Sequence, residues 1–270
     1  MPRSPTGARL LVVWRARVPD VSNRMLARAA ARNNAEWCHA FSRTHGIDGL
    51  FHAAFWSSPV RPPPYYPDAV TLRPKITVEH VLSRIDSGEG CSVKDSFACL
   101  DLGSAGFRPM FRAEWVVRQP AKGRRAARRG WSTVTTEAQL REWEASWGDV
   151  PGGSGFFRPA LLTDETIAVL AGYDGDRVVS GAITNRSATV IGLSNVFDTA
   201  GDLDSAWVAG AAAAATLWGD LPTVSYDSGD ALDAAHGAGF ESIGELVVWL
   251  NEPRHLGEPK GNFGRPTHKG

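Results

Sequence analysis

The sequence has few cysteines and no excess of charge of either sign. Its three cysteines, Cys38, Cys91 and Cys99, are odd in number and lack the paired spacing of a zinc site or a disulfide framework. We therefore expect reduced thiols with a packing role. The formal net charge is zero, so no overall field attracts the chain to nucleic acid or to a membrane surface.

Long apolar runs are also missing. The run nearest the N-terminus, Leu10 to Trp14, is too short for a signal peptide or a membrane span. With 43% hydrophobic and 21% charged residues, the 270-residue chain has the composition of a globular protein with one large or two small domains. These features predict a cytoplasmic protein that does not associate with membranes.

Several motifs of known chemistry are absent as well. The chain has no P-loop, no glycine fingerprint of a Rossmann fold, no serine-centred nucleophile elbow and no zinc-ligand spacing. These absences exclude the enzyme classes that depend on those motifs, and we expect no metal site.

What the first half does contain is a long helical pattern between two strand-like segments. The segments 9–18 and 49–58 are strand-like, and between them small and apolar residues recur at helical spacing up to a stop signal at Gly46. A proline-rich loop follows. Trp56, Tyr65 and Tyr66 flank or lie in this loop, where they either wall a ligand pocket or fill the core.

Alternating strand and helix patterns complete this half. The segments 68–74, 91–97 and 110–118 predict strands, and the segments 77–85 and 98–107 predict helices. This alternation is typical of a sheet that helices cover.

A basic stretch separates the two halves. Residues 118–130 carry six basic residues, no acidic residue and no long apolar side chain. The stretch is either a solvated interdomain linker or a contact for an anion such as RNA.

The second half is more regularly patterned. Residues 135–148 predict a capped amphipathic helix, and residues 166–197 predict three antiparallel strands joined by tight turns. An alanine-rich helix, a strand, a helix and a last strand follow at 205–219, 223–228, 230–240 and 243–250.

One closing pattern occurs twice. The dipeptide Gly106-Phe107 precedes the last predicted strand of the first half, and Gly239-Phe240 precedes the last predicted strand of the second half. A glycine lets a helix end in the left-handed conformation, and the phenylalanine can then plug the sheet below it. The repeat predicts two copies of one architectural closure.

With this order of elements, the second half resembles the GCN5-related N-acetyltransferase (GNAT) superfamily over roughly residues 131 to 251. The first half resembles the C-terminal portion of the same fold, without an obvious copy of its hairpin. The resemblance implies an α/β (α+β) protein of two GNAT-like domains, each with a mixed, mostly antiparallel twisted sheet flanked by helices. The N-terminal copy, 1–118, is degenerate, and a basic linker, 119–130, the C-terminal domain, 131–254, and a flexible tail, 255–270, follow.

The resemblance also implies where an acyl-coenzyme A would bind. In GNAT enzymes a splayed strand edge pairs with pantetheine, and the next loop and helix start bind the diphosphate. The matching strand edge is Leu193, Ser194, Asn195, Val196 and Phe197, and the matching loop runs from Gly201 through Ser205 to Ala206. This loop departs from the family pattern, because it holds one glycine and three acids, Asp198, Asp202 and Asp204, and carboxylates repel a diphosphate. We expect Asp204 or Ser205 to cap the helix.

The first half offers a second place for an anion. Its strand 68–74 leads into a predicted helix with Arg73 and Lys75 at the junction and Thr77 as a possible cap. The same residues also fit an ordinary charged loop.

Acyl transfer needs proton-transfer groups, and the family's usual one is missing. GNAT enzymes often have a tyrosine four residues before the glycine of the Gly-Phe pair, where this chain has Ala235 and, in the first half, Leu102. The substitutes near that place are Tyr226, Asp227 and His236. Asp95, beside Lys94, is the parallel candidate in the first half, and each of these residues is also compatible with a structural role.

The sequence therefore predicts an acyltransferase that moves an acetyl or related group from an acyl-coenzyme A to an amine of a small molecule. An aminoacyl-tRNA-dependent transferase, with tRNA contacting the basic stretch 118–129, is one alternative. A non-catalytic binding protein on a degenerate GNAT fold is the other. We expect a monomer or a homodimer.

Overall fold

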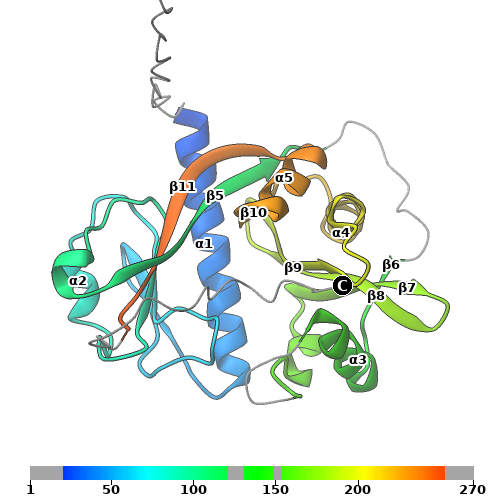
Figure 1. The fold of residues 1–270 in the computed structure, drawn as a ribbon, viewed down its shortest axis with the longest axis horizontal. Coiled ribbons are helices and arrows are strands. Elements are labelled where there is room, and N and C mark those ends of the chain that lie inside the picture. Colours follow the sequence, from blue (N-terminus) through cyan, green and yellow to red (C-terminus); the bar gives the residue numbers. More distant parts are fainter. Residues whose placement is uncertain (1–20, 121–130, 149–153, 253–270) are drawn as a thin grey trace, which may run out of the picture.

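The computed structural model describes residues 21–120, 131–148 and 154–252. Their strands form one 11-stranded sheet in the order β1-β2-β3-β4-β11-β5-β10-β9-β8-β7-β6 (Figure 1). Two of the ten neighbouring pairs, β3 with β4 and β9 with β10, are parallel, and the others are antiparallel. The mixed, mostly antiparallel character expected from the sequence is confirmed, but the strands of both halves form one sheet and not one sheet in each half.

The first half supplies a long helix and five strands. Its elements are α1 (Val21–Thr44), β1 (Leu50–Phe51), β2 (Phe55–Ser57), β3 (Ala69–Thr71), α2 (Val78–Leu82), β4 (Ser92–Asp95), the 3₁₀ turn η1 (Gly103–Ala105) and β5 (Arg108–Arg118). The second half supplies β6 (Trp131–Thr133), α3 (Glu137–Trp147), η2 (Pro159–Thr163), β7 (Ile167–Asp174), β8 (Arg177–Arg186), β9 (Ile191–Asp198), α4 (Leu203–Trp218), β10 (Thr223–Asp227), α5 (Asp230–Gly237) and β11 (Glu241–Leu250).

The two halves exchange strands at the centre of the sheet. The last strand of the second half, β11, pairs with β4 of the first half, and β5 of the first half pairs with β10 of the second. β5 and β11 also pair with each other over almost their whole lengths, from Glu241↔Val117 to Leu250↔Arg108. Each half therefore completes the sheet of the other, and backbone hydrogen bonds run from one half to the other without a break.

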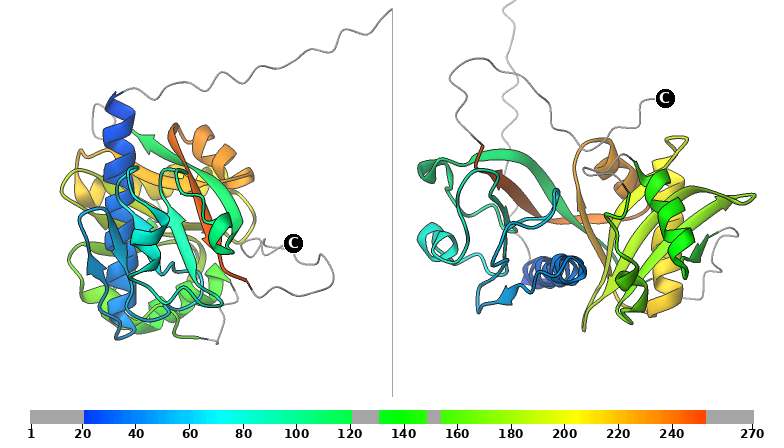
Figure 2. Two further views of the ribbon diagram at one scale, coloured as in Figure 1. Left: turned by 90° about the vertical axis from the view of Figure 1, so that its left-hand side faces the viewer. Right: turned by 90° about the horizontal axis from the view of Figure 1, so that it is seen from below.

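Helices cover both faces of the sheet, and the side chains of each strand alternate between the two faces. Val169 and Ala171 of β7 pack with α1 and α3, whereas Ala168 and Leu170 pack with α4 and α5. In the first half, Val70 packs with α1 on one face and Ala69 packs near α2 on the other. Helix α1 thus spans both halves on one face, and Figure 2 shows it end-on between the two parts of the curved sheet.

Most of the predicted elements are confirmed, with three errors. The single strand expected at 49–58 is two short antiparallel strands, β1 and β2. The helix expected at 98–107 is only the 3₁₀ turn η1, because the loop around it is held by Asp95, whose carboxylate accepts a hydrogen bond from the backbone N–H of Leu100. The short strand β6 was not expected from its sequence. The expected strand at 9–18, most of the basic stretch and the whole tail, 255–270, lie outside the described residues.

The repeated Gly-Phe closure is confirmed as a backbone device. Gly106 has φ +92° and Gly239 has φ +85°, both in the left-handed region. Phe107 and Phe240 are each 3% exposed, at the start of β5 and β11 respectively. The two exchanged strands therefore begin in the same way. Within the described residues, no helix is long and apolar enough to cross a membrane.

Candidate functional site

The two parallel strands β9 and β10 separate soon after they begin. They pair only at Ile191↔Thr223 and Gly192↔Val224, and the rest of β9 pairs with β8. This opening, which we call the second-half split, leaves one edge of Leu193 to Phe197 without a neighbouring strand among the described residues. The predicted cofactor edge lies along it.

A bulge re-aims the backbone of β9 at this edge. Ser194 pairs with Ile183 and Phe197 with Gly181, so β9 has one more residue than β8 between these pairs. Asn195 lies in the bulge with φ +52°, a left-handed conformation that is uncommon for a residue other than glycine. Such strained positions cluster at functional sites, because they turn a backbone group toward a ligand.

The equivalent opening in the first half is closed by hydrogen bonds. Strands β3 and β4 also pair at two positions, Ala69↔Val93 and Val70↔Lys94. Beyond them, the Thr71 hydroxyl accepts a hydrogen bond from the backbone N–H of Ser96 at 2.8 Å. The first-half split is therefore bridged at the point where the second-half split is open.

Asp95 belongs to this bridge. Its carboxylate accepts hydrogen bonds from the Thr71 hydroxyl at 3.5 Å and from the backbone N–H of Leu100 at 2.7 Å. Burial raises the pKa of Asp95, while these hydrogen bonds act in the opposite direction. These contacts place Asp95 in the local structure of the loop after β4.

The loop after β9 holds its own backbone N–H groups. The Asp198 carboxylate accepts hydrogen bonds from the N–H groups of Ala200 at 2.8 Å and Asp202 at 3.1 Å. Asp202, and not Asp204 or Ser205 as expected, is the N-cap of α4, and its side chain accepts from the N–H of Ser205 at 3.0 Å. The backbone N–H groups that a diphosphate would need in this loop are therefore already bound by the carboxylates of Asp198 and Asp202.

Helix α1 lies against the start of the second-half split. The Asn33 side chain donates to the carbonyl of Asn185 at 3.2 Å, and the Asn185 side chain donates back to the carbonyl of Asn33 at 3.1 Å. Gly192 is packed so closely under this pair that a Cβ there would overlap both side-chain oxygens. The first half therefore supplies one border of the opening in the second half.

A buried lysine joins the two halves beside this border. Lys94, 4% exposed, donates through Nζ to Asn34 Oδ1 and to Tyr226 Oη, each at 2.9 Å. Its ammonium group also lies 4.2 Å from the centre of the Tyr226 ring. The half-buried Tyr226 is thus held by a cation from the opposite half, with Trp115 packed edge-on at 5.3 Å between ring centroids.

The other predicted catalytic residues lie apart from this contact. Asp227 is buried at the end of β10 and accepts a hydrogen bond from the N–H of Ser228. His236 is exposed near the end of α5, where its Nε2 lies 3.0 Å from the Ser242 hydroxyl. Ala235, at the place of the family's tyrosine, is completely buried. The structure brings Tyr226 close to the opening and places His236 at a helix end.

The aromatic residues around the proline-rich loop divide between core and surface. Trp56 is fully buried and donates to His39 Nδ1 at 3.3 Å. Tyr66 is stacked on Phe41 with ring centroids 3.6 Å apart, and burial raises its pKa well above the usual value. Tyr65 is 55% exposed. Two of the three rings therefore fill the core.

Sequence reasoning missed the meeting of Lys94 and Tyr226. A signal for it was present, because β4 continues as Lys94-Asp95-Ser96 and β10 as Tyr226-Asp227-Ser228. The two residues occupy equivalent places in the two halves, and the strand exchange brings equivalent places together.

Comparison with solved structures agrees with this architecture. A GCN5-related N-acetyltransferase from Kribbella flavida superposes with a TM-score of 0.60 at 14% identity, over 84% of this chain and 97% of that one. A protein assigned to the GNAT family of acetyltransferases from Novosphingobium aromaticivorans superposes with a TM-score of 0.51 at 11% identity, over 82% and 97% of the two chains. No model of a protein family matches the sequence, and no curated protein matches it. At these identities the likeness establishes the fold.

Proposed function

We propose that this chain, which has the fold of the GCN5-related N-acetyltransferases, is an N-acyltransferase. It transfers an acetyl or related acyl group from a coenzyme A thioester to an amine of a small molecule. The observation that carries the proposal is the second-half split, where β9 leaves β10 after Gly192 and the strained Asn195 turns the strand backbone. An extended pantetheine can add to such an edge as a further strand does.

The proposed reaction needs groups that stabilise an oxyanion and a group that transfers a proton. The amine nitrogen attacks the thioester carbonyl, a C–N bond forms, the C–S bond breaks, and a proton passes from the amine to the thiolate. Backbone N–H groups of the bulge around Asn195 stabilise the oxyanion. Tyr226 moves or holds the proton, because it is a half-buried hydroxyl at the end of β10 that hydrogen-bonds the Lys94 ammonium.

The residues fit only part of coenzyme A at this position. The strand edge fits pantetheine, whereas Asp198 and Asp202 occupy the N–H groups that a diphosphate would use. This observation favours a second candidate, an aminoacyl-tRNA-dependent transferase, whose donor ester requires no diphosphate-binding loop. The basic stretch 118–129 remains the proposed tRNA contact.

The missing tyrosine supports a third candidate, a non-catalytic binding protein. Ala235 and Leu102, at the two equivalent places, cannot transfer a proton. The two-domain division, the cytoplasmic location and the monomeric or homodimeric state stay predictions of the sequence.

One binding experiment separates the candidates. Thermal unfolding is followed with acetyl-coenzyme A, with free coenzyme A and without ligand, because a ligand that binds only the folded state raises the melting temperature. We expect acetyl-coenzyme A to raise it in the wild type and not in Asn195→Val, in which a β-branched residue cannot adopt the bulge conformation. The control is Ala98→Val, since Ala98 also has a left-handed φ, +50°, but lies in the first half.

The outcomes assign the donor. A shift that Asn195→Val loses and Ala98→Val keeps supports the acyl-coenzyme A donor. No shift at millimolar coenzyme A contradicts it, and binding of aminoacyl-tRNA but not deacylated tRNA then supports the second candidate. If neither donor binds, the non-catalytic protein is the function that stands.

A further inference from the structure

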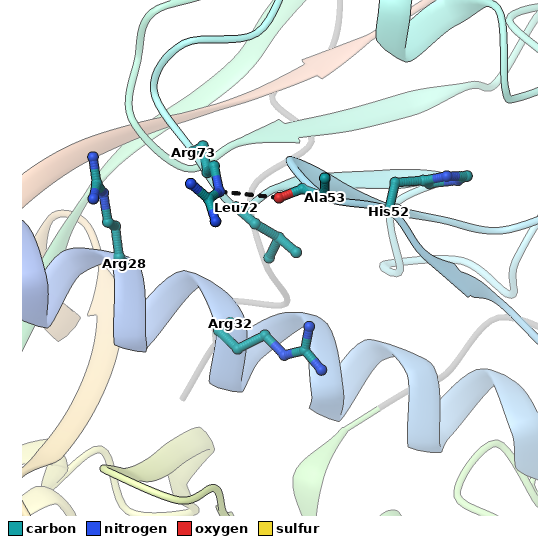
Figure 3. A pocket seen from close by; sticks show the side chains of 6 residues that line it. All are labelled: Arg28, Arg32, His52, Ala53, Leu72 and Arg73. Atoms are coloured by element: carbon teal, nitrogen blue, oxygen red, sulfur yellow. Dashed lines mark hydrogen bonds between the residues drawn. The ribbon is translucent and has the colours of Figure 1, made fainter.

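A basic hollow of about 250 Å³ lies in the first half, between α1 and the ends of β1 and β3. It is lined by Arg28, Arg32, His52, Ala53, Leu72 and Arg73. Figure 3 shows Arg28 rising from α1 on the side where Arg73 lies, whereas Arg32, one turn further along the helix, extends along α1. Among the described residues, the lining contains three guanidinium groups from two separate segments and no carboxylate.

Two of the guanidinium groups are oriented by contacts that leave part of each group for a ligand. Arg73 donates through Nε to the carbonyl of Ala53 at 3.0 Å, which fixes the plane of its fork. Arg32 donates through Nε to Glu36 at 2.7 Å and lies over the ring of Phe51 at 4.0 Å. An arginine fixed through Nε still presents its two terminal nitrogens, which can bind a phosphate group in a bidentate manner.

The charged groups near the hollow are mostly cationic. Burial lowers the pKa of His52, and the nearby Arg84 and His80 lower it further. Glu36, on the exposed surface of α1, is the carboxylate that faces Arg32. A field of one sign concentrated in a hollow attracts ligands of the opposite sign.

Two residues of the lining, Leu72 and Arg73, follow β3 directly, as the predicted diphosphate loop of the second half follows β9. β3 and β9 are the strands that precede the two splits, and the residues that follow them differ in charge. After β3 come Arg73 and Lys75, whereas β9 ends at Asp198 and is followed by Asp202. The segment after β3 therefore carries cations where the segment after β9 carries carboxylates.

We propose that this hollow binds a phosphate or diphosphate group of a small molecule. Arg28 and Arg73 contact the phosphate oxygens, and Arg32, whose charge is balanced by Glu36, lines the hollow beside them. The volume is under the roughly 300–1,000 Å³ of pockets that bury drug-sized ligands, so it suits the phosphorylated end of a molecule and not a whole nucleotide. The binding does not depend on acyl transfer.

Isothermal titration with inorganic pyrophosphate at constant ionic strength tests the proposal. We expect saturable binding to the wild type, and Arg28→Gln and Arg73→Gln each to weaken it about tenfold, because each removes a charged hydrogen bond. Arg177→Gln is the matched control, since Arg177 is an exposed arginine of β8 in the other half. Absence of saturable binding at millimolar pyrophosphate overturns the proposal, as does equal binding by all three variants.

A second titration identifies the molecule that carries the phosphate. Pyrophosphate is titrated into the protein with coenzyme A present in excess. Loss of pyrophosphate binding assigns the hollow to the phosphates of the donor, an assignment that rests on the proposed function. Retained binding assigns it to a phosphorylated acceptor. Either outcome leaves the anion site established, so failure of the acyltransferase proposal and failure of this one are distinguishable.

Discussion

Each half of the molecule contains one pair of parallel strands, β3 with β4 and β9 with β10, and only the second pair is open. In the first half, the Thr71 hydroxyl bridges the point where β3 and β4 would separate, because it accepts from the backbone N–H of Ser96 and donates to the Asp95 carboxylate. In the second half, β9 and β10 separate after Gly192, and α1 of the first half lies beside the opening. The comparison indicates that the first half supports and borders a site while the second half provides its open strand edge.

The largest effect is expected where α1 docks beside the open split. Gly192→Ala places a methyl group against the side-chain oxygens of Asn33 and Asn185, two buried residues whose Nδ2 groups donate hydrogen bonds to each other's backbone carbonyls. We expect a loss of about 2–3 kcal/mol in the free energy of unfolding, measured by urea denaturation. Gly237→Ala is the control, because its nearest neighbour, Asp204 Oδ1, lies at 3.6 Å and the position is helical. Equal stabilities of the two variants would show that α1 does not dock tightly at this point.

The second-largest effect is expected at the hydrogen bond that bridges the first-half split. Thr71→Val leaves the backbone N–H of the fully buried Ser96 without its partner. We expect a loss of about 1–3 kcal/mol, the usual cost of an unsatisfied buried group. The control is Thr216→Val in α4, whose hydroxyl donates to the carbonyl of Ala212 on an exposed surface. The comparison between the halves loses its basis if Thr71→Val changes stability no more than Thr216→Val does.

A smaller effect is expected at the bulge of the open split. Asn195→Gly keeps the left-handed backbone, whereas Asn195→Ala strains it by about 1 kcal/mol. Both substitutions delete the same side-chain amide, so their difference reports the backbone. We expect the alanine variant to melt lower and to bind the donor more weakly than the glycine variant. Identical behaviour of the two variants would mean that the bulge conformation is not used.

The sequence predicted the parts of this fold that local patterns determine. The Gly-Phe closures, the three strands from β7 to β9 and the capped helix α3 follow from turn residues, alternation and a Thr136–Gln139 capping box. The exchange of β5 and β11 was not predicted, because each strand has the same alternating pattern whichever half it joins. The helix expected at 98–107 was wrong because the Asp95 carboxylate, five residues before Leu100, accepts a hydrogen bond from the Leu100 N–H and so holds this segment as a loop.

The candidate site was less predictable than the fold, because several of its contacts join residues that are far apart in the chain. The strand edge at Leu193 to Phe197 was placed by the order of elements, and the acids of the following loop were visible in the sequence. The hydrogen bond between Lys94 and Tyr226, and the hollow that joins Arg28 to Arg73, both connect residues far apart in the chain. Contacts of this kind depend on how α1 crosses the sheet, which no local pattern specifies.

The smallest expected effect is the acid sensitivity of the first half. His39, His45 and His52 all lie there, and burial lowers the pKa of each below its usual value. A histidine whose folded-state pKa is lowered contributes stability that is present above the unfolded pKa of about 6.5 and is lost as the pH falls below it.

His45→Gln can keep the hydrogen bond to the carbonyl of Phe156, which His45 Nε2 makes at 2.9 Å, without titrating. We expect a shallower loss of stability in this variant than in the wild type between about pH 6.5 and pH 5. The difference between the two proteins should be constant above about pH 8, where histidine is neutral in both states. Parallel stability curves throughout would show that His45 does not link the stability of the first half to pH.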